Sequence, residues 1–95
     1  MDLELAGRTA LVTGASAGIG RSIALALAAE GARLAVTARR GDRLRALEKE
    51  AGAKLAIIEQ DFMLPDAPQR IAQAALAALG SVEILVNNAG GSRPF

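Results

Sequence analysis

Apolar residues occur along this chain in short continuous runs that alternate with longer runs of helical spacing. The first continuous run, residues 9–13, lies between two glycines and is typical of a strand buried on both faces of a parallel sheet. From Gly18 the spacing changes, because Ile19, Ile23 and Leu27 recur every four residues and indicate a helix with one apolar face. The same alternation then repeats to the end of the chain.

The complete pattern predicts an alternation of strands and helices. The elements are strand 9–13, a helix from Gly18 to residues 30–31, strand 34–38, a helix from an Asp42 cap to Gly52, strand 55–58, a helix that follows the connection 65–68 and ends at Gly80, and strand 82–86. The expected apolar faces are Leu44, Leu47 and Ala51 in the second helix, and Ile71, Ala72, Ala75, Leu76 and Leu79 in the third. Such an order predicts an α/β fold with a parallel sheet and right-handed crossovers.

Composition narrows the class of protein. With 95 residues, 52% of them hydrophobic, the chain can form one small domain and is not disordered by composition. A net charge of +1 without a basic block argues against a nucleic-acid or membrane-surface partner. The absence of cysteine and histidine argues against a disulfide framework and a metal site. No segment resembles a signal peptide or reaches membrane-spanning length, so we expect a cytoplasmic protein.

A glycine-rich loop joins the first strand to the first helix and has the spacing G-x-x-x-G-x-G. The N-terminus of a helix offers unpaired N–H groups to a phosphate, and glycine lets the backbone approach it closely. No Lys-Ser or Lys-Thr pair follows, so this is not a P-loop. The alternative is a plain strand-to-helix turn. The candidate cofactor-binding residues of the loop are Gly14, Ser16, Ala17, Gly18, Ile19 and Gly20.

Two motifs together resemble a known family. The loop from Thr13 to Gly20 is similar to the cofactor motif of the short-chain dehydrogenase/reductases, and residues 87–90 (NNAG) are similar to that family's second landmark. The resemblance covers residues 5–95 and implies a Rossmann-type doubly wound sheet with strand order 3-2-1-4. Residues 1–95 would then be the N-terminal part of a single dinucleotide-binding domain. In that order two helices cover one face, the third covers the other, and residues 84–86 form an apolar edge strand.

The end of the second predicted strand indicates which nucleotide is preferred. Dinucleotide sites often place an acid about 20 residues beyond the loop to bind the ribose 2′-hydroxyl, whereas arginine accommodates a 2′-phosphate. Here Ala38 stands at the position of the acid, and Arg39 and Arg40 follow it. Ser16 offers a further hydroxyl donor. The sequence therefore predicts NADP(H) in preference to NAD(H). The alternative is a pair of solvated surface arginines.

Two further candidate contacts depend on the family resemblance. It implies that the Asp61 carboxylate binds the adenine amino group and that the backbone N–H of Phe62 reaches the ring, although Phe62 is larger than the aliphatic residue usual there. It also implies that Asn88, Ala89 and Gly90 line the ribose, with Thr13 as the hydrogen-bond partner on the neighbouring strand. The alternatives are an ordinary turn aspartate and a polar turn after a strand.

The resemblance implies an NADP(H)-dependent oxidoreductase that moves hydride between nicotinamide and a small-molecule carbonyl or secondary alcohol, commonly as a homo-oligomer. The family's catalytic Ser, Tyr and Lys would lie beyond residue 95, and the chain contains no tyrosine. We therefore expect no catalytic residue here and interpret the chain as the first part of a longer one. The alternatives are a non-catalytic NADP(H)-binding module and a structural remnant whose glycine loop binds nothing.

Overall fold

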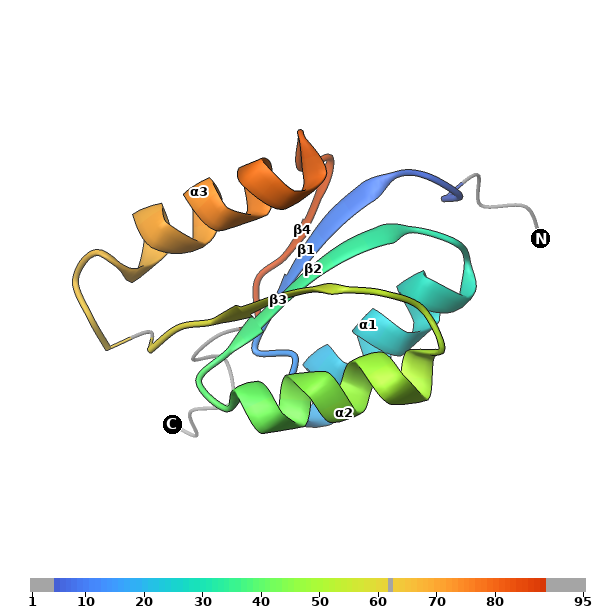
Figure 1. Cartoon of the computed structure of the whole chain (residues 1–95), viewed down its shortest axis with the longest axis horizontal. Coiled ribbons are helices and arrows are strands. Elements are labelled where there is room, and N and C mark those ends of the chain that lie inside the picture. The colour runs from blue at the N-terminus through green and yellow to red at the C-terminus, as the bar shows by residue number, and fades with distance from the viewer. Residues whose placement is uncertain (1–4, 62, 89–95) are drawn as a thin grey trace.

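Strands and helices alternate along the whole described part of this computed structural model, which comprises residues 5–61 and 63–88 (Figure 1). The elements are β1 (Thr9–Thr13), α1 (Gly18–Ala29), β2 (Arg33–Ala38), α2 (Gly41–Ala51), β3 (Ala56–Glu59), α3 (Ala67–Leu79) and β4 (Ile84–Val86). All strand pairs are parallel, and the order across the sheet is β3-β2-β1-β4. The predicted fold and strand order are confirmed, with strand boundaries shifted by one or two residues.

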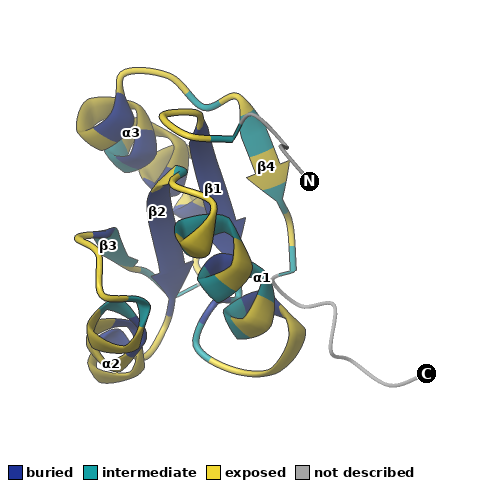
Figure 2. Cartoon of the chain, turned by 90° about the vertical axis from the view of Figure 1, so that its right-hand side faces the viewer, coloured by how far each residue is buried: buried dark blue, intermediate teal, exposed yellow. Residues whose placement is uncertain are grey.

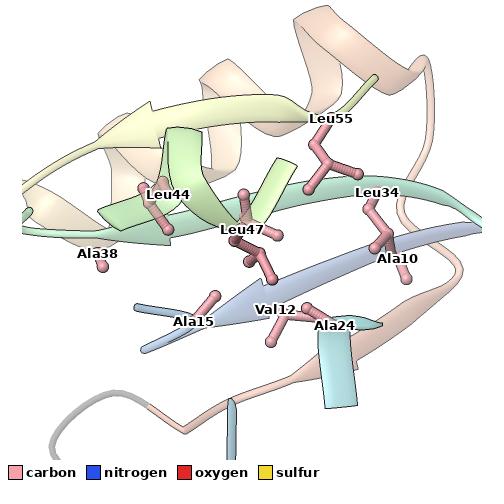
Figure 3. Close-up of a cluster of buried hydrophobic side chains, with 10 residues drawn as sticks. Ala10, Val12, Ala15, Ala24, Leu34, Ala38, Leu44, Leu47 and Leu55 are labelled. Atoms are coloured by element: carbon pink, nitrogen blue, oxygen red, sulfur yellow. The ribbon is translucent and has the colours of Figure 1, made fainter. Parts of the chain in front are cut away.

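The sheet separates two layers of helices (Figure 1). Helices α1 and α2 lie on one face and contribute to one core cluster, which contains Val12, Leu44 and Leu47 (Figure 3). Helix α3 covers the opposite face with Ile71 and Ala75. β1 and β2 form the buried centre of the sheet, whereas β4 at its edge is partly exposed (Figure 2). No helix within the described residues is long and apolar enough to cross a membrane.

Two predicted helix faces are wrong in part. Ile19 belongs to the predicted apolar face but is 71% exposed, because the buried residues of α1 are Gly20 and Ala24. In α3 the buried residues recur at intervals of four, which leaves Ala72 exposed and Leu76 half exposed. In both helices small residues approach the sheet, so some larger apolar side chains lie on the outer surface.

Asp42 does not cap α2 as predicted. The helix begins at Gly41, its N-cap is Arg40 without a side-chain cap, and Asp42 lies in the first turn. The Gly41 N–H instead donates to the Glu59 carboxylate, 3.2 Å away, at the end of β3. The predicted end of α2 is confirmed, since Gly52 adopts the left-handed conformation (φ 69°) that a side chain would disfavour.

Thr37 is a buried polar residue in the middle of the sheet, and its Oγ1 has no hydrogen-bond partner in the described structure. A buried hydroxyl without a partner keeps its full desolvation penalty. We expect Thr37→Val to raise the free energy of unfolding by about 1 kcal/mol in urea denaturation. Thr13→Val serves as a control of opposite sign, because the Thr13 hydroxyl is hydrogen-bonded to residues after β4. A loss of stability in Thr37→Val would contradict this interpretation.

A carboxylate joins β4 to β1 at the amino end of the sheet. Glu83 Oε1 accepts the Thr9 N–H at 3.0 Å, and Arg8 Nε lies 3.1 Å from Glu83 Oε2. The Glu83 N–H in turn donates to the Thr9 carbonyl oxygen at 3.1 Å. The hydrogen bond from the Thr9 backbone, with help from the Arg8 charge, holds the pKa of Glu83 below its ordinary value.

A carboxyl whose pKa is lower in the folded state stabilises the protein above the pKa of the unfolded state. That contribution is lost as the pH falls through the folded pKa, below the ordinary glutamate range of about 4. We therefore expect the melting temperature of the wild type to fall more than that of Glu83→Gln when the pH is lowered from about 6 to about 3. Thermal unfolding at both pH values measures the difference, and an equal fall in the two proteins would contradict it.

Candidate cofactor site

The candidate residues lie at the edge of the sheet where the parallel strands end. Thr13 of β1 is in register with Thr37 of β2, Ala38 of β2 with Glu59 of β3, and Val12 of β1 with Val86 of β4. The loops after β1, β2, β3 and β4 therefore leave the sheet on the same side (Figure 1). A cavity of about 420 Å³ bordered by Arg33, Leu55 and Leu79 lies at the opposite edge and is not part of this region.

The glycine loop turns sharply from β1 to α1. Gly14 has a φ of 64°, and the N–H of the buried Ala15 donates to the Thr37 carbonyl at 3.2 Å, which anchors the loop on β2. Ala17 is the extended N-cap of α1, and Gly18 follows with a φ of 61°. A Cβ built on Gly18 meets nothing within 4 Å, so the space beside the start of the helix is open. Ser16 is half-buried within the loop.

Gly20 brings α1 close to the loop. A Cβ at this position would lie 2.3 Å from the Gly14 carbonyl oxygen and 2.9 Å from Asn88 Nδ2. No side chain fits there unless backbone atoms shift. Gly20 therefore fixes the first turn of α1 against both the glycine loop and the segment after β4.

The N-terminus of α1 carries no compensating negative charge. It has no side-chain cap and no acidic residue in its first turn. By contrast, α2 begins beside Glu59 and Asp42, and α3 begins at Asp66. Within the described residues, α1 is thus the helix that begins beside open space at Gly18 without a carboxylate at its cap or in its first turn, and its positive dipole end suits an anionic ligand.

The segment after β4 is tied to β1 through one hydroxyl. Thr13 Oγ1 donates to Asn87 Oδ1 at 3.0 Å and accepts the Asn88 N–H at 2.8 Å. Asn88 Nδ2 also lies 3.5 Å from the Gly14 carbonyl oxygen. The expected hydrogen-bonded role of Thr13 is confirmed, and these contacts bring Asn88 beside the glycine loop.

The two arginines after β2 have different surroundings. Arg40 makes a two-point contact with Asp42, with Nε 3.2 Å from Oδ1 and Nη2 3.1 Å from Oδ2. Arg39 is exposed and makes no ion pair or side-chain hydrogen bond with the part of the chain that the structure describes. Ala38 is only 4% exposed and packs in the core cluster, so an aspartate substituted there would need to turn out of the core.

Asp61 lies beyond β3, where its Oδ1 accepts the Met63 N–H at 2.9 Å. This contact belongs to a local turn. Three predicted site residues, Phe62, Ala89 and Gly90, fall outside the described residues. No group of three metal-ligating side chains is present among residues 5–61 and 63–88.

Two residues of this region were not predicted as site residues. Glu59 contacts the start of α2 from β3, and Asn87 accepts the Thr13 hydroxyl. Asn87 could have been found, because it precedes Asn88 directly in the same motif. No signal in the sequence indicates Glu59, because its contact is made with a residue 18 positions earlier in the chain.

Comparison with known proteins gives consistent matches. A family model described as short chain dehydrogenase matches residues 8–95. A short chain dehydrogenase of Pseudocercospora fijiensis (strain CIRAD86) is 44% identical over 93 residues, which cover 95% of this chain and 30% of that protein. A metagenomic short-chain oxidoreductase solved in complex with NADP is 45% identical with a TM-score of 0.83, covering 90% of this chain and 40% of that one.

L-sorbose reductase from Gluconobacter frateurii, solved with NADPH and L-sorbose, has a TM-score of 0.84 at 36% identity. The match covers 95% of this chain and 36% of the reductase chain, so this chain spans little more than a third of that length. The family match includes β1, the glycine loop and the Asn87–Asn88 segment, which are the elements that form the described site. With its strand order, its loop and these matches in agreement, the chain belongs to the short chain dehydrogenase family.

Proposed function

We propose that this chain is the cofactor-binding part of an NADP(H)-dependent oxidoreductase of the short-chain type. The observation that carries the proposal is the N-terminus of α1, which begins beside open space without a side-chain cap or carboxylate. A pyrophosphate suits this position because it accepts hydrogen bonds from the exposed N–H groups and is stabilised by the helix dipole. When bound, the nicotinamide cofactor supplies the hydride chemistry.

The residues of the site fit a dinucleotide in a definite order. Gly14, Ser16, Ala17, Gly18 and Ile19 would contact the pyrophosphate, and Gly20 would hold the helix close to the loop. Asn88, Ala89 and Gly90 would line the ribose, and Asp61 with Phe62 would contact the adenine. Each contact is a proposal for this chain, and the positions of Gly14, Gly20 and Asn88 beside one another support it.

The preference for NADP(H) over NAD(H) rests on the end of β2. An arginine can bind a 2′-phosphate through charge-assisted hydrogen bonds, whereas NAD(H)-selective sites use an acid at the position of Ala38. Arg39 lies directly after Ala38 without a partner among the described residues, so its guanidinium group is available for the phosphate. Two solved relatives are complexes with NADP and NADPH, which supports the same cofactor here.

The reaction would transfer hydride between nicotinamide and a carbonyl or secondary alcohol. The substrate is a small molecule, the working protein is a homo-oligomer, and its location is cytoplasmic in this proposal. The family's Ser, Tyr and Lys would be supplied by residues after Phe95. Residues 1–95 would hold and orient the cofactor but would not contact the reacting atoms of the substrate.

Calorimetric titration of NADPH and NADH, followed by measurement of NADPH oxidation with a panel of carbonyl compounds, tests the proposal on the natural protein. We expect NADPH to bind more tightly than NADH and to be consumed with at least one carbonyl. Binding without turnover across the panel would favour a non-catalytic NADP(H)-binding module. Binding of neither nucleotide would favour a structural remnant.

A further inference from the structure

We propose that Asp42 is a specificity-determining residue, which weakens the binding of a 2′-phosphate by holding Arg40. This inference rests on the proposed NADP(H) function and assigns unequal roles to the two arginines. Arg39 would bind the phosphate directly, whereas Arg40 would contribute only to the extent that it leaves Asp42.

The geometry of the pair supports competition with a phosphate. Arg40 uses Nε and Nη2 to contact both oxygens of Asp42, and these are the same planar donors that bind a phosphate at two points. The hydrogen bond from Arg40 also holds the pKa of Asp42 below its ordinary value, so the carboxylate stays charged at neutral pH. A phosphate that approaches Arg40 must therefore displace a charged competitor.

The other charges around the turn also affect how strongly a phosphate is attracted to Arg40. Arg39, Arg40 and Arg43 carry three positive charges at this turn, while Asp42 and Glu59 carry two negative charges, so the formal sum is +1. The Glu59 carboxylate accepts the Gly41 N–H and is not in contact with the guanidinium group of Arg39 or Arg40. Replacing Asp42 by asparagine would release Arg40 and raise the local charge to +2 without disturbing the Glu59 contact.

The size of the expected effect follows from the exposure of the pair. The side chains of Arg40 and Asp42 are 56% and 66% exposed, and exposed ion pairs are weak. We expect Asp42→Asn to bind NADPH roughly two- to fivefold more tightly than the wild type. The affinity for NADH should stay the same, because NADH has no 2′-phosphate. A purely structural effect on the turn would change both affinities.

The experiment is a double-mutant cycle with Asp42→Asn and Arg40→Ala, measured by calorimetric titration of NADPH and NADH into the natural protein. The gain in NADPH affinity from Asp42→Asn should disappear in the Arg40→Ala background. Asp66→Asn is the matched control, since it also removes one charge and one exposed aspartate–arginine pair at the start of a helix, here α3 with Arg70 as partner. It should leave both affinities unchanged.

Three outcomes would overturn the inference. The first is a wild-type preference for NADPH that Asp42→Asn leaves unchanged, which would leave the proposed function intact. The second is a gain of equal size with and without Arg40, which would show that Asp42 acts by its own charge. The third is a wild type that binds NADPH no better than NADH, which would overturn the proposed cofactor preference as well.

Discussion

Gly20→Ala is expected to remove NADPH binding and to lower the free energy of unfolding by about 1–3 kcal/mol. The added methyl group would lie 2.3 Å from the Gly14 carbonyl oxygen and 2.9 Å from Asn88 Nδ2. Because the closest atom is backbone, relief requires α1 to move away from the glycine loop. That movement would change the positions of the N–H groups proposed to bind the pyrophosphate. Urea unfolding and calorimetric titration measure the two effects separately.

Gly52→Ala provides a matched control for this change. Gly52 has a positive φ of 69°, but a Cβ there meets nothing within 4 Å. The residue is the C-cap of α2. We expect a loss of about 1 kcal/mol from backbone strain and no change in NADPH affinity. Wild-type affinity in Gly20→Ala would contradict the proposed role of the loop, whatever its effect on stability.

Arg39→Ala is expected to weaken NADPH binding by roughly ten- to a hundredfold while leaving NADH nearly unchanged. Charge-assisted hydrogen bonds contribute about 1.5–3 kcal/mol, which corresponds to this range of affinity. Arg39 is expected to carry most of the discrimination because it follows Ala38 directly and has no partner in the described structure. The effect should shrink with added salt, since an exposed charge is screened. Titration of both nucleotides at low and high salt measures it.

Arg40→Ala is the natural comparison for Arg39→Ala. It removes the same group one residue away, but that group already contacts Asp42, so its loss should weaken NADPH far less. If Arg39→Ala weakens NADPH and NADH equally, the arginine supports the fold or the shared phosphates. The NADP(H) preference would then lose its main support.

Local patterns in the sequence were enough to predict the elements and their order. A strand in a continuous apolar run and a helix that ends at a glycine are both determined by residues that are neighbours in the sequence. For this reason β1, β2 and the end of α2 at Gly52 lie close to where they were expected. The exposed Ile19 shows where this reasoning fails. Periodicity favours large apolar residues for the buried face, yet the buried residues of α1 are Gly20, which lies against the glycine loop, and Ala24, which lies in the core.

The candidate site was predictable only where its motifs are continuous in the sequence. The glycine loop and the segment before Ala89 are such motifs, and the structure places Gly14 and Asn88 next to each other. The start of α2 was not predictable in this way. Aspartate is a common N-cap residue, which is why Asp42 was predicted to cap α2. In the structure the Glu59 carboxylate of β3 accepts the Gly41 N–H, and Asp42 contacts Arg40. Glu59 lies near Gly41 because the register of β2 and β3 pairs Ala38 with Glu59, and this pairing cannot be read from a local pattern.

The side-chain contacts at the two ends of β4 have a consequence for the order of folding. Thr9 and Thr13 bind Glu83 and Asn87 across 74 residues of sequence, and β4 itself contains only three residues. Closing so long a loop costs conformational entropy, and contacts of such separation form late. A partly folded chain would therefore present its glycine loop without Asn88 beside it. Among the four described strands, β4 would therefore dock after β1, β2 and β3, and a nucleotide bound at the proposed site would stabilise the docked state over partly folded ones.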